Sequence, residues 1–217
     1  MTSTEWIAKT AGLLRDEKLA SVLVRLMMVM NDIGITNSQM LEWEKTEDMK
    51  KKPRARGAIL YFGRVQSAHL FEALDIIEEI KRDPDLKARV ARSDRRIIGF
   101  FDIVAAFLGS KDHALMAKMR NVVAFHYDPK LAMRRLKSLV EKYPDHRFGY
   151  SMGNETLDWY FDLGDLIADG ILIRDIFEIK EDQDIAAGAL EVLKRLHVIG
   201  EAFTNFAGYF IRECCKK

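Results

Sequence analysis

The chain has 217 residues, of which 48% are hydrophobic and 31% are charged, and its formal net charge is +1. These values suit one medium-sized domain with a packed core and an ordinary soluble surface. The nearly neutral charge excludes a polycation that coats nucleic acid by electrostatics alone. The two cysteines, Cys214 and Cys215, are neighbours in the sequence. Neighbouring cysteines rarely form a structural disulfide, so the pattern indicates a reducing compartment.

The sequence predicts a cytoplasmic protein without a membrane partner. The segment Met1–Trp6 contains no basic stretch followed by an apolar one, so we expect no secretory signal. The most apolar run, Ile97–Leu108, is interrupted by Asp102 and is shorter than the roughly 20 residues that cross a bilayer. We therefore expect this run to form a core helix.

Apolar residues recur at helical spacing along nearly the whole chain, and no stretch alternates with a period of two for long. The first predicted helix carries an apolar stripe over residues 19–33, with a capping-box start at Thr2–Glu5. A second helix is expected over Ser38–Met49, with its serine as the cap. A basic connector over residues 50–56 contains a proline that halts this helix, and a long third helix follows over residues 56–82.

A basic, proline-containing segment over residues 81–92 comes next and has room for a short turn of helix. Ser93 or Asp94 can cap the helix that contains the most apolar run, and Gly109 is expected to end it. Ser110 can cap the helix after that.

Asp128–Pro129 is expected to start another helix to about Lys142, because proline is favoured in a first turn. The segment over residues 143–153 contains one proline and two glycines and is predicted to be a loop. Asn154 is expected to cap a helix to Ala168, with Gly170 as its end.

The final helix is predicted from about Asp184 to Glu213, a span of roughly 45 Å at 1.5 Å per residue. Its apolar stripe has seven-residue regularity with small residues at alternate turns, which suits close packing against another helix of this chain or of a second copy. The stripe consists of Ala189, Leu193, Leu196, Gly200, Phe203, Ala207 and Phe210. The sequence thus predicts an all-α fold: an up-and-down helical bundle with a long C-terminal helix, forming a single domain over residues 1–217.

The segment that follows Met119 gathers unusual chemistry in a stretch that otherwise reads as buried helix. It holds a guanidinium, an amide, an imidazole and a phenol, on Arg120, Asn121, His126 and Tyr127. An arginine that grips a phosphate and a histidine that moves a proton form a minimal set for metal-free phosphodiester chemistry. On a helical wheel His126 lies in the apolar stripe and Arg120 lies about 120° away at its edge. We therefore expect either that the helix ends near Tyr127 or that a second copy supplies the complementary group.

This segment resembles the signature of the HEPN superfamily, small helical domains found in many bacterial toxins and defence ribonucleases. The family motif is an arginine, a polar residue and a histidine about four to six positions on, which Arg120, Asn121 and His126 match. The pair Arg64 and His69 has similar spacing but lacks the polar residue after the arginine. The resemblance covers about residues 56–140, with helical extensions on both sides.

The resemblance implies a homodimer whose two motifs line one cleft and cut single-stranded RNA without a metal or other cofactor. His126 would act as general acid or base in attack by the ribose 2′-hydroxyl, and Arg120 would hold the phosphate. Asn121 would orient a side chain or the RNA backbone, and Tyr127 would bind phosphate or stack on a base. A toxin or defence role and a neutralising partner protein follow as expectations.

Other functions remain open from the residues. The same groove could bind RNA, a nucleotide or a protein without turnover. In a purely structural alternative, His126 is a core histidine with satisfied hydrogen bonds and Arg120 is half of an ion pair. A metal-dependent nucleotide hydrolase could instead use acidic residues at helical spacing to hold magnesium, although a solvated face is the simpler interpretation. These residues are Glu155, Asp158, Asp162, Asp165 and Asp169.

Polar residues elsewhere suggest supporting roles. His69 and Gln66 lie in the apolar arc of the third helix and could border the cleft, with Glu72 orienting the imidazole; the simpler interpretation is a buried histidine with satisfied hydrogen bonds. Basic groups could steer an acidic polymer toward the cleft, although such runs are often only solvated. They are residues 50–56, Lys87, Arg89, Arg92, Arg95, Arg96, Arg134, Arg135 and Lys137.

Overall fold

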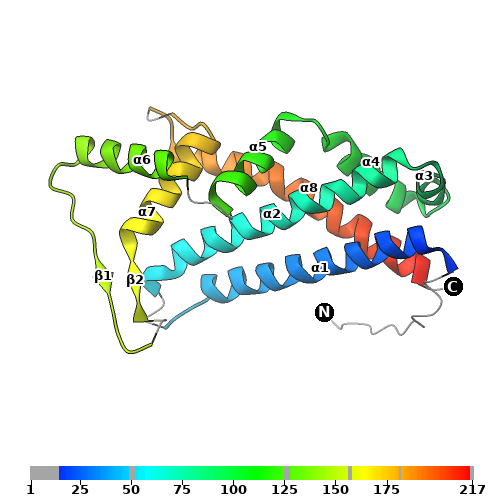
Figure 1. The fold of residues 1–217 in the computed structure, drawn as a ribbon, viewed down its shortest axis with the longest axis horizontal. Coiled ribbons are helices and arrows are strands. Elements are labelled where there is room, and N and C mark those ends of the chain that lie inside the picture. The colour runs from blue at the N-terminus through cyan, green and yellow to red at the C-terminus, as the bar shows by residue number, and fades with distance from the viewer. Residues whose placement is uncertain (1–14, 49–51, 125–127, 156–157, 181, 216–217) are drawn as a thin grey trace.

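The computed structural model describes residues 15–48, 52–124, 128–155, 158–180 and 182–215. These residues form a helical bundle with a small two-stranded sheet, which confirms the all-α prediction and the long C-terminal helix (Figure 1). The elements in chain order are α1 (Glu17–Glu44), η2 (Lys52–Arg54), α2 (Ala55–Arg82), α3 (Pro84–Ala91), α4 (Arg95–Phe107), α5 (Lys111–Met119), η3 (Arg120–Ala124), α6 (Pro129–Lys142), β1 (Tyr150–Ser151), β2 (Tyr160–Phe161), α7 (Asp162–Gly170), η5 (Ile171–Ile176) and α8 (Ile185–Cys215). The segments η3 and η5 are π-helical, and η2 is a 3₁₀ turn.

The core lies between the three long helices. Helix α1 packs along α2, and α8 contacts α1 and α4. The fully buried side chains come from all three long helices and include Leu23, Leu74, Ile77, Phe203 and Phe206. The predicted stripe of α8 enters this core from Leu196 onward, but Leu193 is 45% exposed and does not belong to it. The stripe therefore packs within the chain over most of its length.

Several helix starts follow the predicted capping chemistry. Asp94 accepts from the backbone N–H of Arg96, Ser110 from that of His113, and Asp128 from those of Lys130 and Leu131. A side-chain oxygen at this position satisfies an N–H group that has no partner within the helix. These contacts confirm the predicted starts of α5 and α6 and select Asp94, rather than Ser93, for α4.

Three predicted boundaries are wrong. Ser38 does not start a second helix, because α1 runs without a break to Glu44 and Asp16 caps it. The capping-box start predicted for the first helix at Thr2–Glu5 lies outside the described residues. Gly34 costs α1 only about 1 kcal/mol of helix propensity, which packing against α2 outweighs. The helix predicted from Asn154 begins only at Asp162, after the β1–β2 hairpin, and Gly170 does not end it because η5 continues the coil.

Helix α1 is long and apolar enough to cross a membrane, by length and composition alone. The predicted apolar run in α4 is shorter. Buried helices of soluble proteins share these properties, and Val22, Leu23 and Leu26 of α1 are buried in the core.

Residues 129–161, here called the arm, contain α6 and the β1–β2 hairpin. Figure 1 shows the arm at the end of the bundle remote from the C-terminus of α8. Helix α6, whose residues are all described, has no buried residue. It is held by Asp175 of η5, whose side chain is 9% exposed and accepts from Nε and Nη2 of Arg135, each at 2.6 Å, and also from Arg134. Burial pushes the pKa of Asp175 up, but these arginines outweigh it, and the pKa lies below its usual value.

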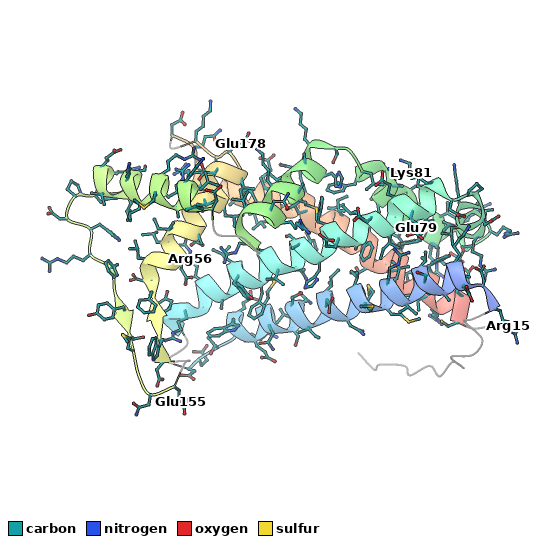
Figure 2. The ribbon with its side chains drawn as sticks, viewed as in Figure 1. Arg15, Arg56, Glu79, Lys81, Glu155 and Glu178 are labelled. Carbon is teal, nitrogen blue, oxygen red and sulfur yellow. The ribbon has the colours of Figure 1, made fainter. Side chains whose placement is uncertain are left out.

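Helix α7 packs its acidic side chains against the start of α2. A Cβ placed on Gly57 would lie 1.9 Å from Oδ2 of Asp165, so this carboxylate rests directly on the glycine backbone. One turn away, Nη2 of Arg56 lies 3.0 Å from Oδ2 of the buried Asp169. Figure 2 shows Arg56 at the N-terminal end of α2, beside α7. A side chain at position 57 would therefore force the Asp165 carboxylate to move.

Gly57→Ala is expected to lower the free energy of unfolding by about 1–2 kcal/mol, because Asp165 must give way to the new methyl group. Urea unfolding measures this change. Gly164→Ala on α7 is the matched control: a Cβ there meets nothing within 4 Å, so the gain in helix propensity should stabilise the protein slightly. Equal effects of the two changes would contradict the close packing at Gly57.

Asp175→Asn is expected to cost about 2 kcal/mol at neutral pH, since it breaks a largely buried pair of charge-assisted contacts. The folded-state pKa of Asp175 is lowered, so its stabilisation is complete above the unfolded value of about 3.9 and is lost as pH falls through the folded value. Urea unfolding between neutral and acidic pH should show the gap between wild type and variant closing in acid. Asp85→Asn, at an exposed carboxylate, should leave stability nearly unchanged.

Candidate active site

The candidate site lies where α5 changes its helical geometry. Ser110 caps α5, and Met116 and Met119 bury its inner face in the core. After Met119 the chain continues as the π-helical segment η3, which contacts both α2 and α5. Short π-helical segments are rare and frequently occur at functional sites. The straight helix assumed for the wheel therefore does not continue through the motif.

Arg120, the first residue of η3, is held on two sides. Its Nε lies 2.8 Å from Oε1 of Glu72 on α2, as an ion pair without aligned hydrogen-bond geometry. Its Nη1 donates to Oδ1 of Asn121 at 2.8 Å. The side chain is 39% exposed. A guanidinium has five N–H donors, so donors remain for an anion within the described surroundings.

The predicted site is thus described only in its first half. The structure brings Arg120 and Asn121 together, and Asn121 is exposed. His126 and Tyr127 lie outside the described residues. Their geometry relative to Arg120, and the predicted pairing of two motifs across a cleft, stay predictions.

Glu72 serves Arg120 and not His69, which corrects the expected role of this carboxylate. His69 is half-buried, and its Nδ1 lies 3.6 Å from Oδ2 of Asp32 on α1. Glu72 pairs with Arg120 of η3, whereas His69 lies near Asp32 of α1. The prediction that His69 borders the cleft stays a prediction, because His126 lies outside the described residues. His69 is only half-buried, so the alternative of a buried core histidine is wrong.

A second polar cluster, not predicted from the sequence, lies between α2 and α7. Arg64 is 8% exposed, and its buried Nε has no hydrogen-bond partner among the residues that the structure describes. Burial raises the pKa of Asp169 and Asp165 raises it further, while Arg56 and Arg64 lower it; the pKa stays above its usual value. Burial and then Asp165 also raise the pKa of Tyr160. Asp165 and Asp169 are four residues apart on α7, a spacing that predicts one shared helix face. Nothing in the sequence indicated that this face packs against α2.

The acidic residues proposed as a magnesium site do not share one helix face. Glu155 lies at the tip of the hairpin (Figure 2), and the carboxylates of Asp158 and Asp162 accept from the backbone N–H groups of Glu155 and Gly149. Over the described part of the chain, no three His, Cys, Asp or Glu side chains gather into a group that could hold a metal ion.

Most of the predicted steering cations have partners within the molecule. Arg134 and Arg135 bind Asp175, Arg96 pairs with Asp94, and Arg89 contacts the sulfur of Cys214. Within the described residues, Lys130 and Lys137 of α6 have no ion-pair partner, and both are exposed. On α6 they are the cations best placed to meet an anionic ligand.

The chain matches no protein-family model, no curated protein and no solved structure.

Glu72→Gln separates a structural role of Arg120 from a ligand-binding one. Both partners are partly exposed, so losing the pair should change the free energy of unfolding by less than about 1 kcal/mol. The freed guanidinium should bind a short single-stranded RNA more tightly, because the carboxylate no longer competes with phosphate. Urea unfolding and fluorescence anisotropy measure the two effects. A large loss of stability with unchanged RNA affinity would make Arg120 a structural residue.

Proposed function

We propose that this protein is a HEPN-like, metal-independent endoribonuclease that acts on single-stranded RNA. The observation that carries the proposal is the position of Arg120. Its partly exposed guanidinium stands at the head of the π-helical segment η3, held by Glu72 and Asn121. The motif histidine follows six residues later in the sequence. A positioned guanidinium beside an imidazole supplies phosphate binding and proton transfer without a metal.

In the proposed reaction, His126 takes the proton of a ribose 2′-hydroxyl, and the resulting oxygen attacks the adjacent phosphorus. Arg120 binds the phosphate through two parallel hydrogen bonds and offsets its developing charge. The bond from phosphorus to the 5′-oxygen breaks, and the imidazole of a second copy, or water, protonates that oxygen. The products are a 2′,3′-cyclic phosphate and a 5′-hydroxyl. The homodimer, the toxin or defence role, the neutralising partner and the cytoplasmic location belong to the same proposal.

The second candidate is an RNA-binding module that uses the same site without turnover. The ion pair with Glu72 favours this candidate, because a phosphate reaches only part of the Arg120 guanidinium unless it displaces the carboxylate. Partial contact is enough for binding, whereas the proposed cleavage uses two parallel hydrogen bonds. Binding in EDTA without product formation distinguishes it from the nuclease. The metal-dependent hydrolase is not proposed, since the acidic residues lie apart in the described structure.

We expect the purified protein to cleave single-stranded RNA in the presence of EDTA. Arg120→Ala and His126→Ala should each lower the rate by at least about 100-fold, as loss of a charge-stabilising or proton-transferring group does. Gel electrophoresis follows cleavage, and mass spectrometry identifies the cyclic phosphate.

His197→Ala is the matched control, because this histidine is exposed on α8 and should not affect cleavage. DNA of the same base sequence should stay intact, since it lacks the nucleophile. Cleavage that survives His126→Ala, or that EDTA abolishes, would contradict the mechanism. Tight RNA binding without product would support the second candidate, an RNA-binding module without turnover.

A further inference from the structure

The two faces of the β1–β2 hairpin make different contacts. Tyr150 pairs with Phe161 across the strands, and Ser151 pairs with Tyr160. Successive residues of a strand point to opposite faces, so Ser151 and Tyr160 share one face and the other two aromatic residues share the opposite face. The first face docks on the bundle: Nη2 of Arg54 donates to the Ser151 hydroxyl at 3.3 Å, and its guanidinium lies 5.0 Å from the Tyr160 ring centroid.

The opposite face carries aromatic rings that cover no core. Tyr150 is 67% exposed and Phe161 is 49% exposed. Their rings are nearly parallel, with centroids 6.4 Å apart, and Phe148 continues the row with its centroid 6.4 Å from that of Tyr150. Grouped exposed aromatic rings are uncommon on a monomer and indicate a binding surface. We call Phe148, Tyr150 and Phe161 the ring face.

The charge of the arm indicates what the ring face binds. Five basic residues and one acidic residue give α6 a formal charge of +4, whereas the whole chain carries +1, so the rest of the chain carries −3. Lys130, Arg134 and Lys137 line one shallow groove on α6, together with the single acid Glu141. The hairpin acids Asp158 and Asp162 accept backbone N–H groups that hold the hairpin together. Helix α6, which precedes the ring face in the chain, is therefore basic although the rest of the chain taken together is acidic.

We propose that the arm binds single-stranded RNA, with phosphates on the Lys130 and Lys137 side of α6 and bases stacked on the ring face. Basic side chains combined with exposed aromatic rings hold single-stranded nucleic acid without strong sequence preference, and the arm carries the two on successive elements, α6 and the hairpin (Figure 1). The inference rests on the proposed function for its substrate, and it adds a substrate-holding surface separate from Arg120. The arm follows the motif directly in the chain, because Asp128 caps α6 two residues after His126.

Binding is measured with a fluorescently labelled 2′-O-methyl RNA of mixed sequence, which lacks the free 2′-hydroxyl and cannot be cut. Replacing both Tyr150 and Phe161 by Ala should weaken binding at least about tenfold, since stacking contributes this much per base. The exchange Tyr150→Phe with Phe161→Tyr keeps both rings and should retain affinity. Ile103→Ala with Leu190→Ala, at exposed apolar positions outside the arm, is the control for surface hydrophobicity.

The cations are tested with Lys130→Gln together with Lys137→Gln. Loss of two phosphate contacts should weaken binding and reduce the slope of log affinity against log salt by about 1.4, given about 0.7 per contact for single strands. Lys87→Gln with Lys194→Gln removes the same charge from exposed positions on α3 and α8 and should leave the slope unchanged. Thermal unfolding confirms that each variant remains folded.

Three outcomes would overturn the proposal. The first is unchanged RNA affinity in the ring and lysine variants. The second is a shift from dimer to monomer when the rings are lost, seen by light scattering without RNA, which assigns the ring face to a second copy. The third is ring-dependent sedimentation with vesicles of equal parts phosphatidylcholine and phosphatidylserine while RNA affinity is unaffected. If arm-dependent RNA binding is present but natural RNA is not cut, the proposal stands and the nuclease function falls.

Discussion

Helix α2 is the element on which the other parts of the structure depend, because it presents a different chemistry to each neighbour. Its apolar side chains, including Leu74 and Ile77, form the core with α1 and α8. Glu72, on another side, fixes Arg120 at the start of η3, and Gly57 lets the Asp165 carboxylate approach the first turn. A shift or rotation of α2 would move the candidate site and the α7 junction together, since packed helices are not continuously deformable.

Local chemistry made most helix boundaries predictable. Ser110 and Asp128 cap their helices as expected, since an oxygen at that position has a defined local partner. Ser38 has the same chemistry but lies inside α1, where packing against α2 keeps the helix continuous. The β1–β2 hairpin has only two residues in each strand, too few for a period of two to be recognised. Tertiary contacts therefore determined the structure at Ser38 and in the hairpin.

The candidate site shows the same division. Arg120 and Asn121 could be identified from their types and spacing, and they are in contact. The role of Glu72 was misassigned. It lies one helical turn after His69 on α2, so the sequence is compatible with a contact to His69, but it is equally compatible with the contact to Arg120 on η3 that the structure shows. The buried Arg64 and Asp169 were not predicted, since they lie 105 positions apart in the numbering and only the α2–α7 packing brings their charges near each other. Spacing along one chain segment carries no information about such pairs.

The distribution of charge connects the arm to the candidate site. A chain of net charge +1 gains little attraction for RNA from its total charge. Separating the charges in space increases the local attraction for RNA. The cations of α6 act within a Debye length of about 8–10 Å, and acids farther away are screened. Asp175 engages Arg134 and Arg135 and so fixes α6 against η5, which leaves Lys130 and Lys137 as the groove cations without an ion-pair partner among the described residues. Anchoring by one set of basic residues thus gives the other set a defined position, and a polyanion held there lies on the segment that immediately follows the motif in the chain.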